Sequence, residues 1–153
     1  MKVTVTGGTG KVGRWVVDAL ASRGHDILVF DRAVAESRAN VRYVLGDIQD
    51  FGQVMGAVAA ADAIVHLAGI PTHGVVANEL TFAINTGGTF NVHEAAWRLG
   101  VSRVVTMSSE AVLGWAPGAW TNLILPEYLP LDEEHPTRPK DSDLLPLSAL
   151  AFG

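Results

Sequence analysis

The residues with the clearest chemical potential form a glycine-rich loop directly after a short β-branched run at the N-terminus. Gly7, Gly10 and Gly13 have the spacing G-x-x-G-x-x-G and lead into an amphipathic stretch. Such a loop turns a strand sharply, and the backbone N–H groups of Lys11 and Val12 then face outward at a helix N-terminus, whose partial positive charge attracts an anion. The third glycine lets helix and strand pack closely. The pattern predicts a pyrophosphate cradle, and the alternative is a tight turn without a ligand.

An acidic residue ends the second strand-like run. Asp31 lies 18 residues after Gly13, close to the ~20-residue offset at which a carboxylate accepts the ribose hydroxyls of a dinucleotide. A carboxylate there repels a 2′-phosphate, so NAD is favoured over NADP. Arg32 follows directly and is a candidate for the opposite preference, because an arginine can hold a 2′-phosphate. The alternative for Asp31 is a solvated strand end.

The elements that must position these groups alternate between two periodicities. Strands are predicted at residues 2–6, 26–31, 41–45, 63–67 and 103–107. Helices are predicted at residues 11–23, 50–60 and 78–99. Apolar strands that alternate with helices indicate an α/β protein with a parallel sheet covered on both faces. Right-handed crossovers then give a Rossmann-like, doubly wound sheet with strand order 3-2-1-4-5. In the first helix, the apolar residues Val12, Trp15, Val16, Ala19 and Leu20 recur at helical spacing.

Composition excludes several classes of protein. The 153 residues are 48% hydrophobic and 18% charged, so the chain is long and apolar enough for one folded domain. It has no cysteine, which excludes disulfides, thiolate metal sites and a cysteine nucleophile. A net charge of -5 argues against nucleic-acid binding. No apolar run reaches the ~20 residues of a membrane span, and a cytoplasmic location is expected.

The last quarter of the chain differs in character. Six of the seven prolines lie within residues 115–153, where no strand or long helix is predicted. We expect residues 1–114 to form a dinucleotide-binding domain and residues 115–153 to form an irregular, proline-rich tail. The acidic cluster at 132–135 is interpreted as a solvated loop, and no metal site is predicted.

Several motifs occur together in a fixed order. They are T-G-G-T-G-K-V-G (6–13), F-D-R (30–32), G-D-I (46–48), V-H-L-A-G (65–69), N-T-G-G-T-F-N-V-H-E-A-A (85–96), M-S-S-E-A-V-L-G (107–114) and L-P-L-D-E-E-H-P-T-R-P-K-D (129–141). With this set the chain resembles the NAD-dependent epimerase/dehydratase family of extended short-chain dehydrogenases/reductases, over about residues 1–141. The resemblance implies NAD as cofactor and a sugar or nucleotide-sugar as substrate.

The resemblance also implies roles for residues along the cofactor. Asp47 and Ile48 match a pair that contacts adenine. Leu67, Ala68 and Gly69 match the segment that follows the pyrophosphate and the ribose.

Three further roles concern the centre of the site. Asn85 matches an asparagine that holds the central geometry, and Ser108 matches a position beside the nicotinamide. Ser109 matches the residue that hydrogen-bonds the reacting substrate oxygen, and it is the one catalytic candidate. His66 lies inside a predicted strand, so it is interpreted as a packed core residue rather than a base.

The sequence departs from the family pattern after residue 141. Family chemistry uses a tyrosine and a lysine four residues apart, and the matching positions hold Asp143 and Leu147. Pro146 would also break the helix that should carry the pair. The family's substrate domain has no counterpart in the 153 residues. We therefore expect a catalytically incomplete NAD(P)-binding protein, and whether it is an enzyme stays open. The alternatives are a non-catalytic NAD(H)-binding sensor and a frameshifted or truncated fragment without activity.

The third predicted helix carries apolar residues that the missing family helix would cover. Phe82, Phe90, Val92 and Trp97 are expected to be exposed. Exposed apolar patches promote association, so the chain is expected to form homo-oligomers or to self-associate.

Overall fold

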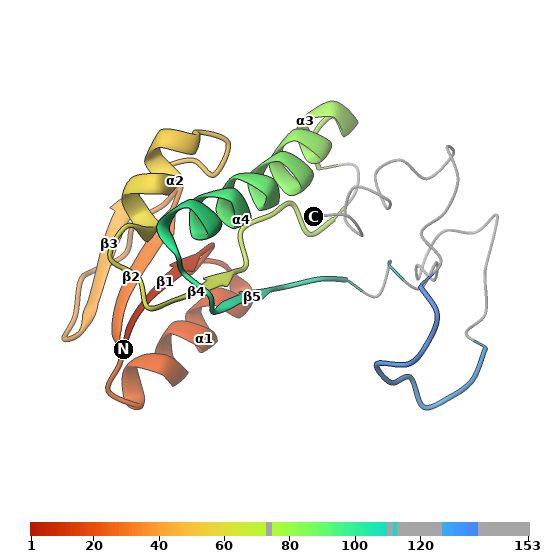
Figure 1. The fold of residues 1–153 in the computed structure, drawn as a ribbon, viewed down its shortest axis with the longest axis horizontal. Helices are drawn as coiled ribbons and strands as arrows, with labels where there is room; N and C mark the ends of the chain where they lie inside the picture. Colours follow the sequence, from red (N-terminus) through yellow and green to blue (C-terminus); the bar gives the residue numbers. More distant parts are fainter. Residues whose placement is uncertain (73–74, 110–111, 113–126, 138–153) are drawn as a thin grey trace.

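The fold is a five-stranded parallel sheet with helices on both faces (Figure 1). The computed structural model describes residues 1–72, 75–109, 112 and 127–137. The strands are β1 (Lys2–Thr6), β2 (Asp26–Asp31), β3 (Val41–Leu45), β4 (Ala63–His66) and β5 (Val104–Thr106). The helical elements are α1 (Lys11–Ser22), α2 (Phe51–Val58), α3 (Asn78–Phe82), the π-helical turn η1 (Ala83–Gly87) and α4 (Gly88–Leu99).

The strand order is β3-β2-β1-β4-β5, as predicted, and every pairing is parallel. Thr6 at the end of β1 stands between Phe30 of β2 and His66 of β4. The strand order switches sides between β1 and β4: β2 and β3 lie on one side of β1, and β4 and β5 lie on the other. In open parallel sheets, ligands bind beyond the carboxyl ends of the strands at this point.

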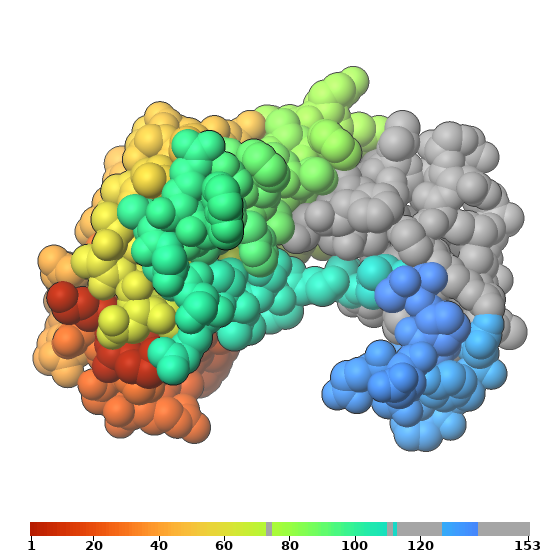
Figure 2. Space-filling model, viewed as in Figure 1, coloured from red at the N-terminus to blue at the C-terminus, as the bar shows by residue number. Residues whose placement is uncertain are grey.

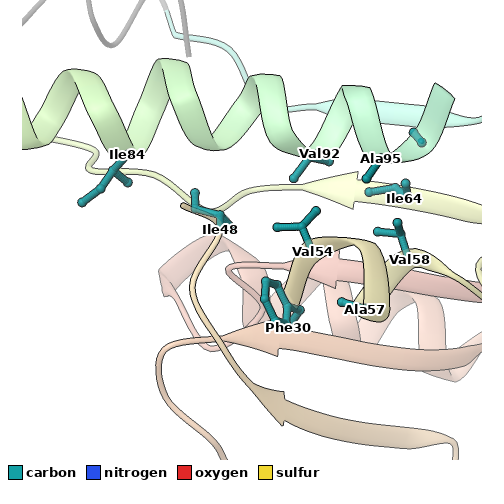
Figure 3. Packing of buried hydrophobic residues seen from close by; sticks show 10 residues of the cluster. Phe30, Ile48, Val54, Ala57, Val58, Ile64, Ile84, Val92 and Ala95 are labelled. Atoms are coloured by element: carbon teal, nitrogen blue, oxygen red, sulfur yellow. The ribbon is translucent and has the colours of Figure 1, made fainter. Parts of the chain in front are cut away.

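Two hydrophobic clusters hold the layers together. The larger cluster joins the sheet to α2 and α4, and Figure 3 shows Val54 and Val58 of α2 between Ile64 of β4 and Phe30 of β2. Val92 and Ala95 of α4 complete this side and are both fully buried. The smaller cluster lies beneath α1, where fully buried valines of β1, β2 and β3 contact the helix.

The face of helix α1 that contacts the sheet overlaps the apolar repeat only in part: Val16 and Leu20 are half-buried, and Leu20 packs against the smaller cluster. Gly13 and Val17 are buried, whereas Val12 and Trp15 are 52% and 76% exposed, and Ala19 is exposed. The reason is the glycine loop: because Gly13 packs directly against the turn before it, the face that continues from Gly13 to Val17 is the one that meets the sheet. The apolar repeat alone did not contain this constraint.

The predicted helix at 78–99 is interrupted by η1. A π-helical turn inside an α-helix adds a residue and is frequent at functional sites. Exposure of Phe82, Phe90 and Trp97 is confirmed, at 55%, 64% and 77%. The prediction was wrong for Val92, which is fully buried because it points into the larger cluster. In the space-filling view, α3 and α4 form a continuous green ridge (Figure 2).

Part of the predicted tail lies within the described residues. Residues 127–137 contain no helix or strand, and residues 115–126 and 138–153 lie outside the described part. In this segment the acidic side chains are exposed, but His135 is 5% exposed and accepts a hydrogen bond from the N–H of Glu127 (3.0 Å). The interpretation of 132–135 as wholly solvated was therefore wrong for His135. No helix among the described residues is long and apolar enough to cross a membrane.

Candidate functional site: a cleft at the carboxyl ends of β1, β2 and β4

The glycine loop brings three segments into contact. Gly7 directly follows β1, and its N–H donates to the carbonyl oxygen of Phe30 (3.1 Å). Its φ is +71°, and a Cβ would lie 2.6 Å from the backbone nitrogen of Ala68, so backbone angle and close approach both require glycine. At Gly13, a Cβ would lie 2.7 Å from the Cα of Gly8. The turn, the start of α1 and the segment after β4 are thus as close as backbones allow.

The N-terminus of α1 is open to an anion. Gly10 occupies the N-cap position, no side chain caps the helix, and the first turn holds no acidic residue. The first N–H groups of a helix lack intrahelical partners, and their partial positive charge favours an anionic group. Lys11 and Val12 occupy the first turn and are exposed, as the pyrophosphate prediction requires.

Asp31 is held by the glycine loop. Its Oδ2 accepts hydrogen bonds from the N–H of Thr9 (2.9 Å) and from the Thr9 hydroxyl (2.8 Å). Its Oδ1 accepts one long hydrogen bond, from the N–H of Ala33 (3.4 Å). The carboxylate is therefore fixed at the end of β2 with Oδ1 available to a ligand. Arg32 next to it is exposed.

The segment after β3 is shaped by two amide side chains. Gln53 of α2 accepts the N–H of Asp47 (3.0 Å), and the Asp47 carboxylate accepts the N–H of Gln49 (2.9 Å). From the other side, the Nδ2 of Asn91 donates to the carbonyl oxygen of Ile48 (2.8 Å). Helices α2 and α4 thus fix the two residues that were predicted to contact adenine.

The segment after β4 is anchored at both of its ends. The Thr6 hydroxyl oxygen accepts the N–H groups of Leu67 (3.2 Å) and Ala68 (3.3 Å). Asn85, in the π-helical turn and 5% exposed, accepts the N–H of Ile70 (2.7 Å) and donates to its carbonyl oxygen (3.1 Å). The predicted central role of Asn85 thus has a concrete form, because this one side chain satisfies both backbone groups of a residue in the cleft wall.

His66 supports this anchor from the core. It is 2% exposed, with Nδ1 2.6 Å from the Thr6 hydroxyl and Nε2 3.0 Å from the Thr89 hydroxyl. Because the Thr6 oxygen already accepts two N–H groups, its own proton is left to donate to Nδ1, so Nε2 carries the imidazole proton. Burial, and then the nearby charge of His93, lowers the pKa of His66 to about 4. His66 is therefore a neutral core residue, as predicted.

Two cavities share the wall after β4. The first has a volume of about 200 Å³ and is lined by Gly7, Thr9, Gly10, Phe30, Asp31, Arg32, Gly46, Asp47, Ile48, Leu67, Ala68, Gly69, Ile70 and Ile84. The second has a volume of about 250 Å³ and is lined by His66, Leu67, Ala68, Gly69, Ile70, Pro71, Asn85, Thr89, Met107, Ser108 and Ser109. Of the predicted site residues, only Lys11, Val12 and Gly13 line neither cavity. They follow Gly10, which does.

Sequence reasoning missed several residues of the cleft. Thr9 and Gly46 lie inside quoted motifs, but no role was assigned to them. A Cβ at Gly46 would lie 2.5 Å from Cζ of Phe30. The signal that could have found Gly46 was a glycine directly after a predicted strand. Asn91 also lies inside a quoted motif without an assigned role, whereas Gln53 lies in none. The roles of both depend on how α2 and α4 meet the loop after β3.

Acid–base chemistry has few candidates here. Ser109 and the exposed Ser108 line the second cavity. The Tyr128 hydroxyl donates to Asp132 (2.7 Å), and this hydrogen bond is the main cause that raises the pKa of Tyr128, which disfavours it as a base. Positions 143 and 147 lie outside the described residues. No group of three or more metal-ligating side chains occurs in the described ranges.

Known proteins share this arrangement. The sequence profile described as "NAD dependent epimerase/dehydratase family" matches residues 3–139. The chain is 38% identical over 120 residues to 3 beta-hydroxysteroid dehydrogenase/Delta 5-->4-isomerase of Mycobacterium tuberculosis (73% of this chain, 32% of the relative). It is 33% identical over 147 residues to UDP-glucose 4-epimerase of Streptomyces lividans (90% and 42%). An NAD complex of a uronate dehydrogenase variant from Agrobacterium tumefaciens superposes with a TM-score of 0.78 at 29% identity (99% and 52%). The chain thus spans about half or less of each of these proteins.

Proposed function

Because this chain belongs to the NAD-dependent epimerase/dehydratase family, we propose that its cleft binds NAD. The observation that carries the proposal is the convergence of Gly7, Asp31 and Asp47 on one cavity, beside the point where the strand order switches sides of β1. These residues come from the ends of three different strands. NADP is the less favoured ligand, because a carboxylate occupies the ribose position.

The residues present fit a dinucleotide. The open N-terminus of α1 suits a pyrophosphate. The Oδ1 of Asp31, which accepts only one long hydrogen bond, suits a ribose hydroxyl. Ile48 and Phe30 give the first cavity apolar walls for a base, and the second cavity continues past the wall after β4 toward Ser108. Each part of an extended dinucleotide thus meets a chemically matched surface.

We propose that the family's chemistry at this site is oxidoreduction at a carbinol carbon of a sugar or nucleotide-sugar. When bound, NAD supplies a nicotinamide ring that exchanges hydride with that carbon. Ser109 would donate a hydrogen bond to the reacting oxygen. The names of two of the similar proteins, a UDP-glucose epimerase and a uronate dehydrogenase, support the substrate class. The relative named for a steroid makes a steroid alcohol the competing class.

We further propose that residues 1–153 bind NAD without turning over substrate. A hydroxyl proton needs an acceptor whose pKa lies near the working pH. Among the described residues that line the second cavity, His66 is the one with an acid–base side chain; its pKa is lowered to about 4, and both of its ring nitrogens are engaged. A general acid–base residue typically contributes roughly 10²–10⁴-fold in rate. A non-catalytic NAD(H)-binding module is therefore the form of the function that this chain supports.

Isothermal titration of the purified 153-residue chain tests this proposal. We expect NAD to bind more tightly than NADP, and Asp31→Ala to weaken NAD binding. A uronate or a 3β-hydroxysteroid, each added with NAD, should yield no NADH above the protein-free control. UDP-glucose added with NAD should not be converted to its 4-epimer, a reaction that leaves no net NADH. Absence of binding by folded protein would overturn the proposal. NADH formation from the uronate or the steroid, or epimerisation of UDP-glucose, would overturn only the claim of no turnover and would identify the substrate class.

A further inference from the structure

We propose that Thr9 is the positioning residue that sets the preference of this cleft for NAD over NADP. The inference rests on the proposed function and adds to it a residue that acts through Asp31. Thr9 occupies a variable position of the glycine motif. The turn nonetheless brings its backbone N–H and its hydroxyl to the same carboxylate oxygen, 22 residues further along the chain.

The hydrogen bonds divide the Asp31 carboxylate into two unlike oxygens. Oδ2 accepts the Thr9 N–H (2.9 Å) and the Thr9 hydroxyl (2.8 Å), which fills its two lone pairs. Oδ1 accepts only the N–H of Ala33, at a long 3.4 Å. A ribose hydroxyl therefore finds a single acceptor, Oδ1, whose position is fixed before the ligand arrives.

This arrangement favours NAD for two reasons. The first is preorganisation: a carboxylate that is already fixed loses little rotamer freedom when it accepts the ribose hydroxyl. The second is repulsion, because a fixed negative charge beside the 2′-position opposes a phosphate that carries roughly −1.5 to −2 charges near neutral pH. A carboxylate free to rotate would reduce both effects.

Because Arg32 lies beside Asp31, the position of the Asp31 carboxylate decides which cofactor the cleft prefers. Arg32 is exposed, lines the same cavity as Asp31, and takes part in no ion pair within the described ranges. An arginine can hold a phosphate with two parallel hydrogen bonds. The cleft thus contains a carboxylate suited to NAD and a guanidinium suited to NADP. By fixing the carboxylate, the Thr9 hydroxyl shifts the preference toward NAD.

The test compares Thr9→Val with Thr9→Ser in the 153-residue chain. Valine keeps the branched shape of threonine but lacks the hydroxyl, whereas serine keeps the hydroxyl. The dissociation constants of NAD and NADP are measured by isothermal titration on the same preparation. Their ratio does not depend on the fraction of protein that is folded.

We expect Thr9→Val to weaken NAD binding about three- to tenfold, the fold-change expected when one more side chain must be immobilised on binding. NADP binding should stay constant or tighten, so the NADP-to-NAD ratio of dissociation constants should fall about three- to tenfold. Thr9→Ser should keep the wild-type ratio. In an Asp31→Ala background, Thr9→Val should change the ratio by less than about twofold, because the two side chains act as one unit.

The outcomes separate this inference from the proposed function. If the wild-type chain binds neither dinucleotide, the proposed function fails and the role of Thr9 fails with it. If the wild type prefers NAD and Thr9→Val keeps that preference, the inference alone is overturned. An equal effect of Thr9→Val with and without the Asp31 side chain would also overturn it, because Thr9 would then act independently of Asp31.

Discussion

Replacement of Gly7 by alanine tests the geometry on which the cleft depends. Gly7 has φ +71°, and an added Cβ would lie 2.6 Å from the nitrogen and 2.7 Å from the Cα of Ala68. Gly100, which ends α4, provides a matched control, because its φ is +72° and an added Cβ there meets nothing within 4 Å. The two substitutions therefore share the backbone strain and differ in the clash.

The magnitude follows from these two terms. A left-handed conformation costs a non-glycine residue roughly 1–2 kcal/mol, and this cost applies to Gly7→Ala and Gly100→Ala alike. Overpacking adds typically about 1–3 kcal/mol, and it applies to Gly7→Ala alone, because the clashing atoms belong to the backbone. We therefore expect Gly100→Ala to lower the free energy of unfolding by about 1–2 kcal/mol and Gly7→Ala to lower it by about 2–5 kcal/mol.

Urea denaturation of the two variants and the wild type measures these differences. Titration with NAD then shows whether Gly7→Ala loses binding under conditions where it is still folded, while Gly100→Ala keeps the wild-type affinity. Equal destabilisation by the two substitutions would refute the argument, because it would mean that the turn and the segment after β4 are not in backbone contact.

Three other outcomes follow from the structure. Burial lowers the pKa of His66 to about 4, so between about pH 6.5 and 4 the unfolded chain binds more protons than the folded chain. The free energy of unfolding should therefore fall by roughly 3 kcal/mol as the pH drops through that range. His66→Gln should reduce this loss, as measured by denaturation at several pH values. Gly46→Ala should destabilise the fold by about 1–3 kcal/mol through its clash with Phe30. Gly56→Ala, where an added Cβ meets open space on α2, should stabilise it by roughly 0.5–1 kcal/mol. In thermal unfolding the Gly56→Ala midpoint should therefore lie above that of the wild type, and the Gly46→Ala midpoint below it. In sedimentation at tens of micromolar the chain should self-associate, and Trp97→Glu on α4 should reduce this more than Trp15→Glu on α1, although the two side chains are 77% and 76% exposed; a monodisperse wild-type monomer would contradict it.

Sequence periodicity sufficed for the sheet because each strand is a short apolar run between turn residues. The five predicted runs coincide with the observed strands to within a residue at each end. Right-handed crossovers restrict a parallel sheet to a few strand orders. The predicted doubly wound order, 3-2-1-4-5, is the one observed.

Helix faces were less predictable. The buried face of α1 is determined by the close packing of Gly13 against the preceding turn. This contact cannot be read from the spacing of apolar residues. Similarly, the interruption of the helix at 78–99 allows Asn85 to reach both backbone groups of Ile70. Gly88, just after η1, leaves room for Ile48, because a Cβ there would lie 2.7 Å from Cγ1 of that side chain.

The candidate site divides in the same way. Gly7 and Asp31 were predictable from the spacing of the glycine motif and the second strand. The residues after β3 and β4 were predicted only from the resemblance to the family. The residues that hold them were not predicted. Thr9, Gln53 and Asn91 act through hydrogen bonds to partners that the fold alone brings near.

The most direct test of the central claim is titration of NAD into the ¹⁵N-labelled chain, followed by two-dimensional NMR. Binding in the cleft predicts that amide signals of residues 7–13, 47–48 and 67–69 shift together and saturate at one dissociation constant. The signals of residues 38–42, at the opposite ends of the strands, should stay in place. Shifts confined to other residues, or no shifts in a folded spectrum, would contradict the assignment of this cleft as a dinucleotide site.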